Sequence, residues 1–67
     1  MAIVKVIEIL SDSSNSWEEA AQNAVTEASK TIKNIKSVYV QDQSCVVTNG
    51  KVTAYRVNVK ISFSVNT

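Results

Sequence analysis

From Ser37 to Val65 the chain alternates apolar and polar residues on both sides of an Asn49–Gly50 pair. Alternation with period two is typical of strands. Asn-Gly is the strongest signal for a two-residue type I′ turn, because both of its central residues need a positive φ. The pattern therefore predicts a long antiparallel hairpin folded at Asn49–Gly50, with Thr48 facing Lys51. Counting back from that turn predicts the cross-strand pairs Val47–Val52, Cys45–Ala54, Gln43–Arg56, Gln41–Asn58, Tyr39–Lys60 and Ser37–Ser62.

This register gives the hairpin two different faces, because successive side chains of a strand point to opposite sides. The predicted apolar face carries Val38, Val40, Val46, Thr53, Tyr55, Val57, Val59 and Ile61. The predicted polar face carries hydrogen-bonding groups and two cations: Ser37, Tyr39, Gln41, Gln43, Arg56, Asn58, Lys60 and Ser62. Such a face is normally solvated in an isolated sheet. In a closed oligomer it could instead line a ligand cavity or a polar network between subunits.

The N-terminal half predicts one strand and one helix. Ala2–Leu10 has Ile and Val on both alternating faces, as expected of a strand that meets protein on both sides, one of them a neighbouring subunit. Ser11–Ser16 is a polar loop that ends in a capping box, in which Ser16 accepts from the Glu19 amide and the Glu19 carboxylate reaches back. An oxygen-rich cation or phosphate site is the alternative for this loop. Trp17–Lys33 has apolar residues at helical spacing, which predicts an amphipathic helix with Trp17 in a core or an interface.

Strand, helix, strand and strand in this order predict an α+β fold, with the helix crossing one face of a three-stranded antiparallel sheet in a single domain, residues 1–67. A chain of 67 residues buries only roughly 60% of its unfolded surface, so it is marginal when it folds alone. The one cysteine, Cys45, excludes an internal disulfide, and the lack of histidine leaves no zinc ligand set. Oligomerisation is the remaining way to gain stability.

Charge and composition exclude several function classes. A net charge of +1 without a basic run gives no electrostatic footprint for nucleic acid. No segment has the length and apolarity of a membrane span or a signal peptide, so a cytoplasmic location is expected. The chain has no histidine and a single glycine, and Cys45 has no basic neighbour in sequence to activate it. The sequence therefore predicts a protein that is not an enzyme.

The whole pattern resembles the dodecins, which are small flavin-binding proteins. The similarity runs from Ile3 to Val65 and is carried by Lys5–Leu10, Ser16–Ala21, Ala24–Val25, Val38–Val40 and Tyr55–Phe63. The resemblance implies a β-α-β-β subunit wrapped around its helix. It also implies a hollow homododecamer of tetrahedral symmetry, with ligand pockets between subunits. The expected function is a non-enzymatic binding or storage protein whose partners are copies of itself and a small ligand, with neither nucleic acid nor membrane involved.

The flavin chemistry of the family carries over only in part. Flavin-binding dodecins have a tryptophan that stacks on the flavin where this chain has Ser37, and a glutamine that bonds the ring edge where it has Arg56. Ser64 lacks the arginine that some bacterial members offer to a phosphate. FMN or riboflavin is therefore expected to bind more weakly or to be replaced by another ligand. The candidate cofactor-binding residues are Ser37, Tyr39, Gln43, Arg56 and Asn58.

The Ser-Trp-Glu start of the predicted helix is similar to a dodecin subgroup that lacks the flavin tryptophan, and for which calcium binding has been proposed. That resemblance implies a hard cation held by carboxylates, with Glu8 and Asp12 as candidate metal ligands and Asp42 as a further carboxylate. The alternative function is thus a calcium- or ion-binding assembly, or a purely structural one.

Overall fold

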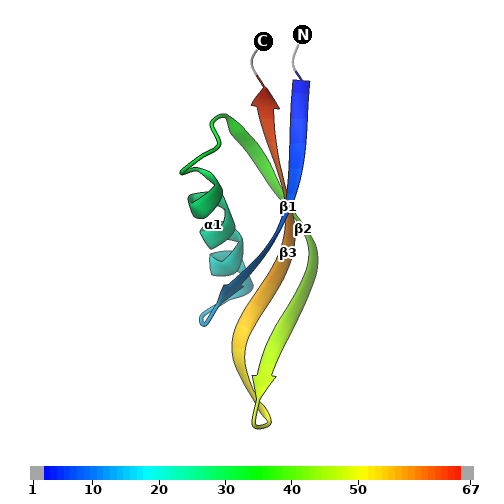
Figure 1. Cartoon of the computed structure of the whole chain (residues 1–67). Coiled ribbons are helices and arrows are strands. Elements are labelled where there is room, and N and C mark those ends of the chain that lie inside the picture. Colours follow the sequence, from blue (N-terminus) through cyan, green and yellow to red (C-terminus); the bar gives the residue numbers. More distant parts are fainter. Residues whose placement is uncertain (1–2, 66–67) are drawn as a thin grey trace.

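The computed structural model describes residues 3–65, which form a strand, a helix and a long hairpin. The elements are β1 (Ile3–Ser13), α1 (Trp17–Ala28), β2 (Ile35–Thr48) and β3 (Lys51–Val65). β3 lies between β1 and β2 and pairs antiparallel with both, and α1 lies against one side of the sheet (Figure 1). The predicted α+β order is confirmed, although Ala2, at the predicted start of the first strand, lies outside the described residues.

The first strand is longer than predicted. It does not end at Leu10, because Ser11, Asp12 and Ser13 continue the ladder against β3. The supposed loop of residues 11–16 is therefore strand for half of its length. The even-numbered side of the strand, which carries Glu8 and Leu10, continues without interruption to Asp12.

The helix is shorter than predicted and ends at Ala28 rather than Lys33. The Val25 carbonyl accepts from both the amide and the hydroxyl of Ser29, at 2.9 and 2.7 Å. The next two amides, of Lys30 and Thr31, donate to carbonyls three residues back, at 3.2 Å each, as in the tightened last turn of a helix. Asn34 then adopts φ 65°, in the left-handed region that asparagine tolerates. This conformation turns the chain into β2, which begins at Ile35, two residues before the predicted hairpin.

The turn of the hairpin is confirmed. Asn49 has φ 53° and Gly50 has φ 75°, as a type I′ turn requires. The pairs Thr48–Lys51, Val47–Val52, Tyr39–Lys60 and Ser37–Ser62 are also present as predicted.

The register between these pairs is wrong in the prediction, because two of the three register shifts of the hairpin lie between them; the third lies between Ile35 and Ser37. Val46 pairs with Ala54 and leaves Thr53 as an extra residue on β3, while Gln41 is the extra residue on β2 between Val40 and Asp42. Thr53 Oγ1 donates to the Val46 carbonyl at 3.4 Å across the first bulge. Each bulge shifts the pairing by one residue and the second cancels the first, so the predicted register holds again from Val40 to Ser37.

Between the bulges each β2 side chain lies on the opposite face from the one predicted. Cys45 pairs with Tyr55 and Gln43 pairs with Val57, in place of the expected Cys45–Ala54 and Gln43–Arg56. The expected Gln41–Asn58 pair is replaced by Asp42–Asn58. Because directly paired residues share a face, Gln43 and Cys45 lie on the helix side of the sheet.

The core lies where α1 crosses the sheet. Ala20, Ala24 and Ala28 are one helical turn apart on the buried side of α1, and they pack against Val57, Val59 and Ile61 of β3. All six residues are at most 7% exposed. Alanine lets the helix approach the sheet closely, but six small or medium side chains make a small core for a chain of this length.

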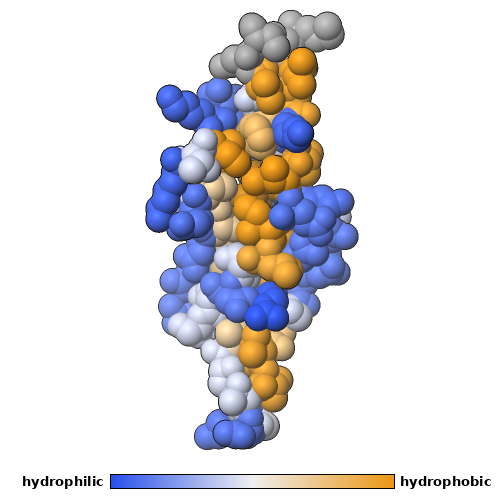
Figure 2. Space-filling view, viewed as in Figure 1, coloured by the Kyte–Doolittle hydropathy of each residue, from blue (hydrophilic) through white to orange (hydrophobic). Residues whose placement is uncertain are grey.

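The chain is elongated, with extents of 50 × 20 × 13 Å. Its radius of gyration is 13.6 Å, against about 11 Å for a compact domain of this length. Its accessible surface is 4791 Å², where about 4,200 Å² is typical of a monomer of 7.3 kDa. Apolar side chains form a band along the molecule between polar flanks (Figure 2). Among residues 3–65, no helix is long and apolar enough to cross a membrane.

Candidate functional site

The sheet face opposite α1, here called the outer face, carries the candidate ligand residues. On β3 the polar residues from Arg56 to Ser62 alternate with the buried Val57, Val59 and Ile61, so they point away from the helix. Their register partners lie on the same face. The outer face therefore consists of Val6, Glu8, Leu10 and Asp12 on β1, Arg56, Asn58, Lys60 and Ser62 on β3, and Ser37, Tyr39, Asp42 and Ser44 on β2.

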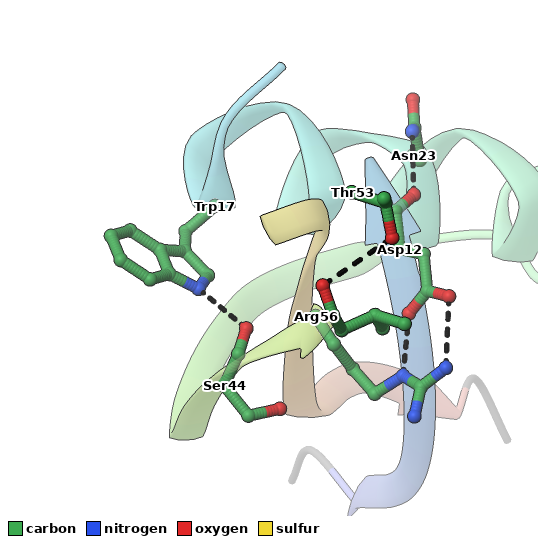
Figure 3. Close-up of polar contacts among 7 residues, drawn as sticks. Asp12, Trp17, Asn23, Ser44, Thr53 and Arg56 are labelled. Carbon is green, nitrogen blue, oxygen red and sulfur yellow. Dashed lines mark hydrogen bonds and ion pairs between the residues drawn. The ribbon is translucent and has the colours of Figure 1, made fainter. Parts of the chain in front are cut away.

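An ion pair between β1 and β3 is the best-defined polar contact of the outer face. Arg56 Nε donates to Asp12 Oδ1 at 2.7 Å, and Arg56 Nη2 donates to Asp12 Oδ2 at 3.1 Å (Figure 3). The two side chains are 44% and 45% exposed. The hydrogen bond from Arg56 lowers the pKa of the Asp12 carboxyl, and the bond to Asp12 raises the pKa of the guanidinium. Both groups are therefore held in their charged forms.

Two side chains of α1 fix the strands on either side of this ion pair. Asn23 Nδ2 donates to the backbone carbonyl of Asp12 at 3.3 Å, and Trp17 Nε1 donates to the carbonyl of Ser44 at 3.0 Å (Figure 3). The Trp17 ring also meets Tyr55 edge to face, with centroids 5.1 Å apart and planes at 74°. Trp17 is half-buried against the core, as the sequence predicted, and here it fastens the start of the helix to β2.

The polar loop before the helix satisfies its own hydrogen bonds. The Glu19 amide donates to Ser16 Oγ at 3.0 Å, which confirms half of the predicted capping box. The Glu19 carboxylate does not reach back to the Ser16 amide; it accepts from Ser13 Oγ at 2.8 Å and from Asn15 Nδ2 at 2.6 Å. These bonds, that from Ser13 first, lower the pKa of Glu19. The loop thus acts as a turn and a helix cap.

Four of the five predicted cofactor residues lie on the outer face. Ser37 is hydrogen-bonded to the Ser62 hydroxyl, and Tyr39 is 65% exposed beside Lys60. The Asn58 Oδ1 atom is buried without a hydrogen-bond partner among residues 3–65. Gln43 is the exception, because the bulge at Gln41 places it on the helix side.

The predicted metal ligands Glu8 and Asp12 share the outer face but are not brought together. They are four residues apart on one strand, a separation of about 13 Å, whereas calcium–oxygen bonds are about 2.3–2.6 Å long. Arg56 already engages both oxygens of Asp12. No three metal-ligating side chains cluster anywhere in the described part of the chain. Within one chain, therefore, these residues do not fit a calcium ion.

Sequence reasoning missed the Asp12–Arg56 contact because it ended the first strand at Leu10. The residue pattern carries no signal for this extension, because residues 8–12 read Glu-Ile-Leu-Ser-Asp and do not alternate. The position of Asp42 and Ser44 on the outer face was not predicted, because the bulge at Gln41 decides it and no glycine or proline marks that bulge in the sequence.

The outer face is open: residues 3–65 enclose no pocket. The fold and this face define a small α+β protein with an open, polar and charged sheet surface. The dodecin family profile matches residues 3–66, and the chain belongs to the dodecin family.

Relatives of known structure extend this likeness. Calcium dodecin from Mycobacterium tuberculosis is 39% identical over 64 residues, which cover 94% of this chain and 89% of that protein. Its crystal structure, described as a calcium-chelating antigen with a novel calcium-binding site, superposes with a TM-score of 0.85 at 33% identity and covers 96% of this chain and 91% of its own. Dodecin from Streptomyces coelicolor gives a TM-score of 0.93 at 26% identity, over 98% of this chain and 94% of its own.

Proposed function

We propose that this protein is a non-enzymatic binding or storage protein that assembles into a hollow homododecamer and holds a small ligand against the outer faces of its subunits. The observation that carries the proposal is the open outer face. It combines fixed charges, hydrogen-bonding groups and exposed apolar side chains, yet the described residues form no pocket of their own. Copies of the chain that closed over this face would supply the missing walls.

The apolar surface of β1 supports self-association. Val4, Val6 and Leu10 are 56%, 51% and 67% exposed in the single chain. All three lie on the outer side of one strand, and Glu8 separates Val6 from Leu10. Burying these side chains between copies would supply the stability that the small core lacks.

The geometry disfavours flavin held in the usual family mode. Ser37 offers no ring to stack on an isoalloxazine, and its hydroxyl is bonded to Ser62. Arg56 is tied to Asp12, so it does not replace a neutral amide at the ring edge. An aromatic pair contributes about 0.5–1.5 kcal/mol beyond its buried area, so the loss of the stacking ring weakens flavin binding several-fold or more.

Two measurements test this proposal. Light scattering of the purified protein at micromolar concentration should give about 88 kDa, the mass of twelve chains of 7.3 kDa; a monomer or dimer would overturn it. In a titration of riboflavin or FMN with the protein, quenching of the flavin fluorescence should require micromolar or higher concentrations. Ser37→Trp should tighten flavin binding about tenfold by restoring the ring. Nanomolar quenching of the unchanged protein would refute the assignment of Ser37.

Calcium is the second candidate ligand, favoured by the 39% identity to calcium dodecin. Glu8 and Asp42 are exposed carboxylates on the outer face, and neither forms an ion pair within residues 3–65. Calcium takes six to eight oxygen ligands, so carboxylates from several copies would have to converge on one ion. Calorimetry with calcium chloride should show a heat of binding, and the control titration with magnesium chloride should show none. Absence of heat, together with a particle mass that chelation leaves unchanged, would leave a purely structural assembly.

A further inference from the structure

The tip of the hairpin is an asparagine followed by a glycine, and we propose that Asn49 is a site of spontaneous covalent modification. The backbone nitrogen of Gly50 attacks Cγ of Asn49 and closes a cyclic imide. The side-chain nitrogen of Asn49 takes up a proton from solvent, which replaces the one lost by Gly50, and leaves as ammonia. Water then opens the imide at either carbonyl and leaves aspartate or isoaspartate at position 49. This inference is independent of the ligand proposed above.

Both reacting groups are free at this turn. Asn49 and Gly50 are exposed, and neither the Asn49 side chain nor the Gly50 amide forms a hydrogen bond within residues 3–65. Apart from the chain neighbours of Gly50, no atom lies within 4 Å of the place where a Cβ would stand on it. The nitrogen and the carbon that it attacks belong to adjacent residues, so the reaction is intramolecular and needs no encounter with a second molecule.

The hairpin tip can leave the turn conformation easily. Closing the imide ring rotates the backbone of Asn49, at φ 53°, out of the type I′ turn. Residues 47–53 are all exposed, with Val47 at 61% and Val52 at 52%. The tip lies well beyond α1, at the lower end of the molecule in Figure 1. A two-stranded segment that nothing covers is marginally stable, so its local opening costs little free energy.

The two asparagines next to and within the helix are held by side-chain hydrogen bonds. Asn15 Nδ2 donates to Glu19 Oε2 at 2.6 Å. The amide that would attack Asn15 belongs to Ser16 and donates to Ser13 Oγ at 3.4 Å. Asn23 Nδ2 donates to a backbone carbonyl of β1 at 3.3 Å, and the residue lies inside α1. Neither residue combines a free side chain with a free neighbouring amide.

The remaining two asparagines of residues 3–65 are each followed by a β-branched residue of a strand. Ile35 follows Asn34 at the start of β2, and Val59 follows Asn58 within β3. A branched side chain crowds its own backbone and restricts the approach of the amide nitrogen. Asn34 is the closest comparison, because it is also exposed and also has a positive φ, 65°. Asn49 differs from it chiefly in the glycine that follows.

The modification changes both the turn and the charge of the chain. Isoaspartate carries the main chain through an extra methylene group, so the two-residue loop loses its type I′ geometry. The pairs Thr48–Lys51 and Val47–Val52 depend on that geometry for their register. Either product also replaces a neutral amide by a carboxylate, which lowers the formal net charge of the chain from +1 to 0. A protein without net charge associates and precipitates more readily.

Mass spectrometry of the assembled protein tests the assignment. The protein is incubated in mildly alkaline buffer and digested with trypsin at intervals, and the peptide 37–51, in which Asn49 is the only asparagine, is followed. That peptide should gain the mass difference between an amide and a carboxyl group, and part of the product should be a substrate of protein isoaspartate methyltransferase. Conversion should be at least about tenfold faster than at the other asparagines of residues 3–65, because only glycine leaves the attacking amide unhindered. The rate should rise with pH, because the Gly50 nitrogen attacks after losing its proton.

Two glycine substitutions separate Asn49 from the rest of the chain. Asn49→Gly should abolish the mass gain of the peptide, because Gly-Gly also forms a type I′ turn but offers no side chain to attack. Asn34→Gly is the matched control at the other left-handed asparagine and should change the rate at Asn49 less than about twofold. An Asn49 that stays intact in the assembled protein overturns the proposal, and so do equal rates at Asn49 and Asn34. A mass gain that persists in Asn49→Gly, or that does not rise with pH, assigns the change to another residue or reaction and overturns it too.

Discussion

Leu10 tests whether the outer face is buried between copies. Among residues 3–65 it is the most exposed of the large apolar side chains, at 67%, and it lies beside Asn58 in the middle of that face. Complete burial of a leucine contributes about 1.5–3 kcal/mol, so covering the exposed two-thirds upon assembly contributes about 1–2 kcal/mol per chain. Leu10→Thr removes most of this area while introducing a β-branched residue that suits a strand.

The concentration at which a twelve-chain particle dissociates shifts with the free energy lost per chain. A loss of about 1–2 kcal/mol from each chain raises the concentration at which half of the particles dissociate roughly 6- to 40-fold. A dilution series by mass photometry measures that concentration directly. Leu10→Met, which keeps the apolar volume, should leave it unchanged. A shift of less than twofold in Leu10→Thr would show that Leu10 stays exposed in the assembly, and would refute the placement of the interface over β1.

Three further substitutions test the fold. Ala24→Leu should destabilise the protein by about 1–3 kcal/mol, seen as a lower denaturation midpoint in guanidinium, because α1 lies too close to the sheet for a larger side chain; the same change at the half-buried Ala21 should cost less, and equal costs would contradict the close packing of Ala24. Gly50→Ala should cost about 1–2 kcal/mol, since φ is +75° with open space around the residue, and an unchanged midpoint would argue against the type I′ turn. The lowered pKa of Glu19 predicts stability that is complete above its unfolded pKa and lost as pH falls through the lower folded value. Glu19→Gln should flatten the acid-unfolding curve there, Glu18→Gln should not, and identical curves for the two would contradict the role of the Ser13 bond.

Much of the fold could be predicted because the relevant signals are local. The Asn49–Gly50 turn follows from which residues tolerate positive φ, and the helix start follows from Ser16 as a cap. The alanine spacing of α1 and the Val57–Val59–Ile61 alternation indicate the two sides of the core from the residue pattern alone. Each of these depends only on a few neighbouring residues and on the repeat of the element, which is 3.6 residues in a helix and two residues in a strand.

The candidate site was less predictable. Alternation correctly places Ser37, Tyr39 and Asn58 on the outer face, but it puts Gln43 on the wrong side. The predicted helix runs too far, over Lys30 and Lys33, because charged residues fit the solvent side of a helix as well as that of a turn. The pattern contains no reason to stop at Ala28.

The sequence by itself determined the order of elements, the hairpin turn and the faces of β3, because these depend on local propensity and periodicity. Only the tertiary structure decided the register between the bulges, and with it the presence of Asp42 and Ser44 on the outer face. It alone also brought together Asp12 and Arg56, 44 residues apart in the chain. A bulge inverts the face of every following side chain, and a cross-strand ion pair depends on the register of two distant segments, so neither is fixed by nearest neighbours in sequence.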